Sequence, residues 1–132
     1  MDPRIDKFLT SAAFGVVGAS ADRSKYGNRV LRCYQQNSLR VVPVNPKEKQ
    51  IEGLDCVATV AELPPEVKSI SVITPPAVTA QVVEAAIAKG ITGIWMQPGA
   101  ESPAAVERCR QAGVNVIADG SCFLVVMHYH EH

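Results

Sequence analysis

Short apolar runs alternate along the chain with segments whose apolar residues recur at helical spacing. Each run stops at a glycine, a proline or a polar turn, which is typical of buried strands. Pro43 cannot donate a hydrogen bond from inside the second run, so that strand is expected at an edge or an interruption of the sheet. We expect five strands, over residues 13–17, 40–44, 69–73, 92–96 and 114–118.

Helical spacing predicts the elements that lie between these strands. They are a short leading helix over about residues 2–11 and helices over residues 28–36, 77–89 and 103–112. Residues 50–60 and the tail have no clear pattern, apart from one helical turn expected near Val60. The inner face of the 77–89 helix is expected to carry Val78, Val82, Ala85 and Ala86.

Strands that alternate with helices favour a parallel sheet covered on both faces. We therefore predict a three-layer α/β fold with a mainly parallel sheet of about five strands and helices on both faces. The 132 residues have the usual length of one domain, and residues 1–132 are interpreted as a single domain.

Composition narrows the classes of partner and compartment. The formal net charge is zero and no arginine-rich run occurs, which argues against a nucleic-acid partner. The apolar stretches are too short to span a membrane and the N-terminus lacks a signal-peptide pattern, so a cytoplasmic protein is expected. The cysteines lack metal-site or disulfide spacing and are expected as buried or half-buried thiols in a reducing compartment. They are Cys33, Cys56, Cys109 and Cys122.

The segments that follow the expected strands carry the candidate binding residues. In such sheets, ligands bind beyond the C-terminal strand ends, where the strand order reverses. Residues 18–20, 45–47, 74–76, 97–99 and 119–120 are small, polar or turn-forming, and together they outline a polar rim. Each segment taken alone is also compatible with an ordinary turn.

The first strand end has the sharpest signal. Gly18 allows a phosphate to approach the backbone, Ala19 is small, and Ser20 offers a hydroxyl group. The helix that follows contributes unpaired N–H groups and the positive end of its dipole. We expect the diphosphate of a nucleotide cofactor here, although the usual dinucleotide spacing G-x-G-x-x-G is absent.

The second strand end separates the candidate cofactors. NAD-binding proteins usually place an acidic residue there for the ribose hydroxyls. This chain has Asn45, Pro46 and Lys47 instead. A cation at that point suits a phosphorylated ribose, as in coenzyme A or NADP, and Arg23 or Lys25 from the long loop 21–27 can serve the same phosphate.

The other strand ends add contacts but no catalytic group. No Ser/His/Asp set and no cysteine beside a base is indicated, so no catalytic residue is predicted. His128, His130 and His132 alternate in the tail, where a solvated terminus is favoured over a metal site. Trp95 is expected in the core. The remaining candidates for cofactor contact are Thr74, Pro75, Pro76, Gln97, Pro98 and Gly99.

Four motifs together resemble the stand-alone CoA-binding domain proteins, which are similar to the CoA-binding domain of the succinyl-CoA synthetase α subunit. The resemblance covers about residues 10–125. The motifs are Val16-Val17-Gly18-Ala19-Ser20, Lys25-Tyr26-Gly27-Asn28-Arg29-Val30, Val44-Asn45-Pro46 followed by Gly53, and Ile94-Trp95-Met96-Gln97-Pro98-Gly99-Ala100-Glu101.

The resemblance implies a Rossmann-like fold that binds coenzyme A, with residues 18–20 at the diphosphate and Tyr26 among the contacts. Residues 45–47 would lie near the adenosine and its phosphate, and residues 74–76 across the cleft. The synthetases carry a further domain with a phosphorylatable histidine that this chain lacks, which argues against ligase activity by this chain alone. Cys122 corresponds to a cysteine that the family often has after the fifth strand, with no role assigned.

Three functions stay open from the sequence. The first is the binding of coenzyme A or an acyl-CoA through its diphosphate, by a non-catalytic binding or regulatory module. An alternative is an NAD(P)-binding oxidoreductase or redox sensor, which rests on fold analogy. The third is a scaffold with a vestigial cleft. A homodimer is compatible with a domain of this class.

Overall fold

The computed structural model describes residues 2–131. Its helices are α1 (Pro3–Phe8), α2 (Tyr26–Gln36), α3 (Pro76–Lys89), α4 (Pro103–Gln111) and α5 (Phe123–Val126), with a 3₁₀ turn η1 (Val60–Glu62). Its strands are β1 (Ala13–Val17), β2 (Val41–Val44), β3 (Gln50–Ile51), β4 (Leu54–Asp55), β5 (Val67–Val72), β6 (Gly93–Met96) and β7 (Asn115–Ile117).

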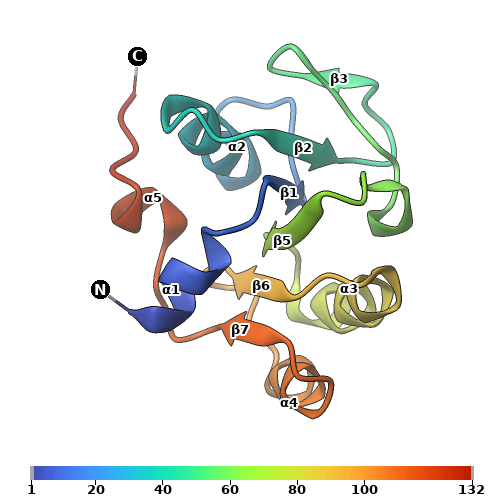
Figure 1. The fold of residues 1–132 in the computed structure, drawn as a ribbon. Helices are drawn as coiled ribbons and strands as arrows, with labels where there is room; N and C mark the ends of the chain where they lie inside the picture. Colours follow the sequence, from blue (N-terminus) through green and yellow to red (C-terminus); the bar gives the residue numbers. More distant parts are fainter. Residues whose placement is uncertain (1, 132) are drawn as a thin grey trace.

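Five strands form one parallel sheet in the order β2-β1-β5-β6-β7 (Figure 1). Helices α1, α2 and α5 cover one face, and α3, α4 and η1 cover the other (Figure 1). This arrangement confirms the predicted three-layer α/β fold. β2 lies at an edge, as Pro43 indicated, and its outer side meets Val57, whose N–H donates to the Pro43 carbonyl at 3.0 Å.

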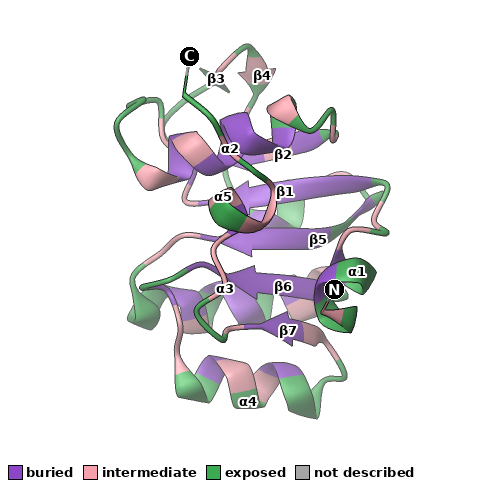
Figure 2. Ribbon diagram, turned by 90° about the vertical axis from the view of Figure 1, so that its left-hand side faces the viewer, coloured by how far each residue is buried: buried purple, intermediate pink, exposed green. Residues whose placement is uncertain are grey.

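The layer beneath α1, α2 and α5 is built from aromatic rings. Trp95 is fully buried, as predicted, and meets Phe8 and Phe123 edge-on with ring centroids 5.4 Å apart in both pairs. Tyr34 stacks on Phe123 at 4.1 Å, and its hydroxyl shares a 2.7 Å hydrogen bond with Ser71. Phe123 therefore fixes α5 and the start of the tail to the sheet. The buried cluster of the opposite layer, as far as residues 2–131 show it, contains aliphatic residues with Met96 and Cys109 and no aromatic ring. In Figure 2 the buried strands run through the middle of the molecule between these two layers.

The inner face of α3 differs from the predicted one. Val82 and Ala86 are buried as expected, but Ala85 is exposed and Val78 is 41% exposed. Thr79 is buried among the helix residues instead. The pattern was misread because α3 carries small or apolar residues on most of its sides, so their spacing does not single out the face that packs on the sheet.

The weakly patterned segment before η1 contains a small hairpin that sequence analysis missed. β3 and β4 pair antiparallel and are joined by Glu52 and Gly53, whose φ angles are 51° and 78°. Two consecutive positive φ values match the tight turns that suit hairpins. Strands of two residues are too short to show an alternating pattern.

The chain reverses its winding direction at β1. From β1 it passes to β2 on one side of the sheet, and from β2 it crosses to β5 on the other side. The C-terminal ends of β1 and β5 therefore flank the point where the strand order reverses, which is the usual ligand position in open α/β sheets. Gly18 and Thr74 stand beside these two ends.

Backbone segments touch at the end of β1. Gly18 has φ +95°, and a Cβ at this position would lie 2.0 Å from the carbonyl oxygen of Ile73. On the other side, a Cβ on Gly27 would lie 2.1 Å from the Gly18 carbonyl oxygen. Both glycines are needed for β1, the end of β5 and the start of α2 to meet this closely.

Removal of the Phe123 ring should strongly destabilise the protein. We expect Phe123→Ala to lower the free energy of unfolding by about 3–5 kcal/mol, because a fully buried aromatic side chain is lost. Val125→Ala lies on the same short helix at a site that is 74% exposed, and should cost no more than about 0.5 kcal/mol. Urea denaturation measures both variants. Equal losses would contradict the assignment of α5 to the core.

The two glycines with φ +95° should respond differently to alanine. A Cβ at Gly99 would meet no atom within 4 Å. Gly99→Ala should therefore lower the free energy of unfolding by about 1–2 kcal/mol, for the left-handed backbone alone. Gly18→Ala adds the clash with Ile73 and should cost at least about 2 kcal/mol more. Thermal or urea unfolding of both variants tests this. A Gly18→Ala protein as stable as Gly99→Ala would show that the backbone contact is not tight.

Candidate functional site

A cleft of about 440 Å³ opens at the C-terminal edge of the sheet, beside the ends of β1 and β2. Its walls come from the two strand ends, the segment before η1 and the exposed side of α3. The lining residues are Val17, Gly18, Ala19, Val44, Asn45, Pro46, Ala58, Thr59, Val60, Thr74, Val78, Gln81, Val82 and Ala85. Val78 and Ala85, which the sequence pattern assigned to the core, therefore line this cleft.

A second hollow of about 300 Å³ lies beside the first along the same edge. It is formed by the ends of β5 and β6, and Thr74 lines both hollows. The Thr74 hydroxyl is hydrogen bonded to the Thr79 hydroxyl at 2.7 Å, which fixes the first turn of α3. The lining residues are Ile73, Thr74, Pro75, Pro98, Gly99 and Ala100.

Asn45 ties two loops of the cleft together. Its Nδ2 donates to the Ala19 carbonyl at 2.9 Å, and its Oδ1 accepts from the N–H groups of Lys47 and Glu48 at 2.7 and 3.0 Å. Both ends of the side chain are thus engaged by the protein. Asn45 therefore holds the β1 turn against the β2 turn, and its neighbour Pro46 closes the cleft wall.

Buried polar side chains of α2 brace the loop that follows β1. Asn28 is fully buried and donates to the Ser20 carbonyl at 2.9 Å. Arg32, one turn further along α2, donates to Asn28 Oδ1 at 2.7 Å and to the Arg23 carbonyl at 2.9 Å. The Ser20 hydroxyl accepts from the Asp22 N–H at 3.1 Å. Asn28 and Arg32 were not predicted as loop supports, because polar residues four apart on a helix equally suit a solvent-exposed face.

The candidate cations stand on exposed loops around the cleft. Arg23 is exposed and lies 3.7 Å from Glu52 of the β3–β4 turn, which also accepts from Asn28 at 3.1 Å. Lys25 and Lys47 are exposed, and the ion pairs found within residues 2–131 do not include them. Lys47 comes directly after the cleft residues Asn45 and Pro46.

Tyr26 and Gln97 meet each other and Cys122. The Tyr26 hydroxyl donates to Gln97 Oε1 at 3.0 Å and lies 2.7 Å from the Cys122 Sγ. Gln97 Oε1 also accepts the Phe123 N–H at 2.8 Å. Burial raises the pKa of Tyr26 above its usual value, with a further contribution from Cys122, so this hydroxyl stays protonated. Neither Tyr26 nor Gln97 lines either of the two hollows.

The structure therefore groups the predicted site residues in three ways. Five line the first cleft and four line the second hollow, with Thr74 common to both. A second group stands on the surrounding loops or at the start of α3: Ser20, Arg23, Lys25, Lys47 and Pro76. The third group is Tyr26 and Gln97, which contact Cys122 or each other. The residues in the two hollows are Gly18, Ala19, Asn45, Pro46, Thr74, Pro75, Pro98 and Gly99.

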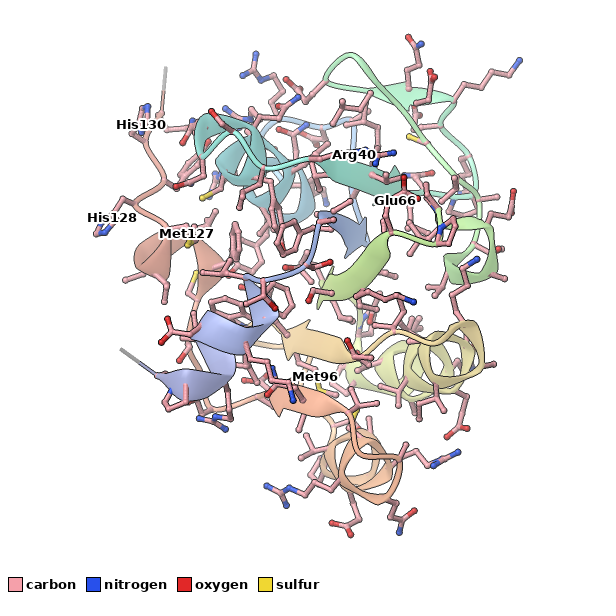
Figure 3. The ribbon with its side chains drawn as sticks, viewed as in Figure 1. Arg40, Glu66, Met96, Met127, His128 and His130 are labelled. Carbon is pink, nitrogen blue, oxygen red and sulfur yellow. The ribbon has the colours of Figure 1, made fainter. Side chains whose placement is uncertain are left out.

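The remaining sequence candidates lie elsewhere. Figure 3 shows His128 and His130 on the C-terminal tail, and the His130 N–H donates to Gln36 of α2. His132 lies outside the described residues. Within residues 2–131, no group of three or more His, Cys, Asp or Glu side chains is arranged to hold a metal ion. None of the helices described is long and apolar enough to cross a membrane.

Comparison with solved structures places this fold among small proteins. A conserved hypothetical protein from Pyrococcus furiosus is 39% identical and superposes with a TM-score of 0.82, over 86% of this chain and 97% of that one. The acetyl-coenzyme A synthetase 1 of Candidatus Korarchaeum cryptofilum is 26% identical, with a TM-score of 0.71 over 83% of this chain and 26% of the synthetase.

Among curated proteins, the chain is similar to part of an acetate–CoA ligase. The chain is 31% identical to the α subunit of ADP-forming acetate–CoA ligase II from Pyrococcus furiosus. The aligned region is 93 residues long and covers 68% of this chain. It spans only about a fifth of the length of that subunit. The family model of the CoA binding domain matches residues 12–128. With the five-stranded sheet and its strand-end cleft, this match shows that the chain belongs to the CoA binding domain family.

Proposed function

We propose that this chain binds coenzyme A or an acyl-CoA, with the nucleotide part in the cleft between the β1 turn and α3. The observation that carries the proposal is the cleft itself, which joins an apolar wall to the Gly18 turn at the point where the strand order reverses. Membership of the CoA binding domain family supports the choice of ligand.

The apolar part of the cleft suits an adenine ring. Val44 and Val60 line it from β2 and η1, and Val78 and Val82 line it from α3. A flat aromatic base against these side chains removes apolar surface from water. Gln81 and Thr59 stand at the rim with polar groups for the ring edge. This role explains why α3 exposes a valine on its cleft side.

The β1 turn suits the diphosphate. Gly18 has no side chain and Ala19 has only a methyl group, so phosphate oxygens can come close to the backbone here. Helix α2 begins at Tyr26 with no side-chain cap and no acidic residue in its first turn. The Asn28 N–H is bonded to the Lys25 carbonyl, so the N–H groups of Tyr26 and Gly27, with the positive end of the helix dipole, are the ones that an anion can use.

The loops around the cleft suit the ribose phosphate of coenzyme A. Lys47 follows the cleft wall directly, and no carboxylate stands at the end of β2 where NAD-binding proteins place one. Lys25 and Arg23 approach from the neighbouring loop, although Arg23 is already near Glu52. Lys47 is therefore the best placed of the three cations.

The proposed role is binding or regulation rather than catalysis by this chain. Neither hollow is lined by an acidic residue, a histidine or a cysteine that could act on a thioester. The chain also spans only a fifth or less of the acetate–CoA ligases that it matches. Binding alone accounts for the cleft, and the reactions of those longer enzymes are not proposed for this chain.

Blocking the apolar cleft should weaken coenzyme A binding without unfolding the protein. Val78→Trp places an indole over the cleft at a site that is 41% exposed, so the thermal midpoint should move by no more than about 4 °C. Calorimetry should give an affinity for coenzyme A at least about tenfold lower than that of the wild type. Val125→Trp, exposed and remote from the cleft, is the matched control. Wild-type affinity in Val78→Trp would exclude this cleft as the adenosine site.

The ribose phosphate should contribute through Lys47. We expect coenzyme A to bind about tenfold more tightly than dephospho-coenzyme A, which corresponds to about 1.4 kcal/mol. Lys47→Ala should remove most of this difference, whereas Lys68→Ala, on β5 near the opposite edge of the sheet, should preserve it. Calorimetry with both ligands, and with NADH as a third, measures this. Equal affinities in the wild type would refute the role of the cation, and tighter binding of NADH would refute the choice of cofactor.

A further inference from the structure

The segment that follows α5, residues 127–131, lies along α2 (Figure 1), and we call it the strap. Side chains at the C-terminal end of α2 bind its backbone. Gln36 donates to the His130 carbonyl at 2.7 Å and accepts the His130 N–H at 3.2 Å. Asn37 donates to the Met127 carbonyl at 3.0 Å. The strap therefore has a fixed path beside α2, although the His130 side chain is exposed.

The strap brings a carboxylate to a buried guanidinium. Arg32 of α2 is only 6% exposed, and its Nη1 donates to Glu131 Oε2 at 3.2 Å. The ring of Tyr129 lies 5.6 Å from the Arg32 Cζ, and the Tyr129 hydroxyl donates to the Glu131 carboxylate. Within residues 2–131, Glu131 is the only ion-pair partner of Arg32. A buried cation without a counter-charge is costly, so Glu131 stabilises Arg32 in this position.

Arg32 passes this restraint to the loop that follows β1. Its Nε donates to Asn28 Oδ1 at 2.7 Å, and its Nη2 donates to the Arg23 carbonyl at 2.9 Å. Asn28 in turn donates to the Ser20 carbonyl at 2.9 Å. Two points of the loop are thus held by side chains of α2, and the charge of one of them is balanced from the strap. A continuous chain of hydrogen bonds leads from the strap to the β1 turn.

We propose that Glu131 is a positioning residue for coenzyme A, which acts by keeping Arg32 on the loop beside the Gly18 turn. Glu131 lines neither hollow. The inference rests on the proposed function, because the diphosphate is the ligand group expected at that turn. Without the Glu131 carboxylate, the Arg32 guanidinium turns toward water and releases the Arg23 carbonyl. The loop must then be ordered when the ligand binds, and this entropy cost lowers the affinity.

The charge of Glu131 by itself would have the opposite effect. Coenzyme A is a polyanion, so removal of a carboxylate from the protein strengthens binding when only the net charge matters. A positioning role requires weaker binding after the same substitution. It also requires that bound coenzyme A stabilises the strap by the same factor, because coupling between two sites is reciprocal. The sign of the change in affinity therefore separates the two roles.

Titration calorimetry of the full chain tests the positioning role. We expect Glu131→Ala to bind reduced coenzyme A about fivefold more weakly than the wild type. Affinity for adenosine 3′-phosphate, which has no diphosphate to meet the β1 turn, should be unchanged. Glu107→Ala removes a carboxylate of similar exposure on α4, paired with Arg110, and should bind both ligands as the wild type does. Because the Glu131 side chain is 63% exposed, its loss should move the thermal midpoint by no more than about 4 °C.

Hydrogen exchange measures the reciprocal effect in the wild type. Saturating coenzyme A should slow exchange of the strap amides about fivefold, the same factor as the loss of affinity in Glu131→Ala. In the ligand-free Glu131→Ala protein, the amides of residues 20–24 should exchange faster than in the wild type, since the loop has lost its support. Glu107→Ala should change neither rate.

Three results would overturn the inference and leave the proposed function intact. The first is wild-type or tighter binding of coenzyme A by Glu131→Ala. The second is an equal loss of affinity for coenzyme A and adenosine 3′-phosphate, which indicates a general loss of structure. The third is strap amides that exchange at one rate with and without coenzyme A. A wild-type protein that does not bind coenzyme A would reject the proposed function, and the role of Glu131 with it.

Discussion

Close contact of three backbone segments at the end of β1 is the constraint on which the rest of the site depends. Gly18 lies against Ile73, at the end of β5, and Gly27, at the start of α2, lies against Gly18. A side chain at either glycine would collide with a backbone carbonyl, so the segments could not meet this closely. The lack of two Cβ atoms therefore brings the turn, the helix N-terminus and the neighbouring strand end to one point, where backbone groups can face a ligand.

Hydrogen bonds made by polar side chains maintain this arrangement. Asn45 joins the β1 and β2 turns, while Asn28 and Arg32 hold the loop that leaves Gly18. Their partners are backbone carbonyl and N–H groups, each other, and the carboxylates of Glu52 and Glu131, so burial costs little free energy and the loop path is fixed. Arg32 also pairs with Glu131 at 3.2 Å, which links the C-terminal tail to the same loop support. The cleft is thus lined largely by small and apolar residues, and hydrogen-bonded polar groups hold its shape.

Much of the fold could be predicted because strand and helix patterns agree with the glycine and proline signals. Pro43 correctly indicated an edge strand, and Trp95 was correctly expected in the core. The α3 face was misassigned at Val78 and Ala85 because periodicity shows that a residue is apolar, not whether the core or a ligand cleft covers it. The β3–β4 hairpin and α5 are too short for periodicity to detect. At the strand ends, the sequence indicated which residues gather there, but not that Tyr26 and Gln97 bond to each other, since that contact joins positions 71 residues apart.

Nitrogen-15 NMR of the full chain during titration with reduced coenzyme A tests the central claim most directly. The account predicts that the largest amide shifts map to Gly18, Ala19 and Gly27 and to the cleft side of α3 around Val78 and Val82. Amides near Lys68 and Thr92, at the opposite edge of the sheet, should be unchanged. Shifts confined to that opposite edge, or no shifts at saturating coenzyme A, would contradict the account.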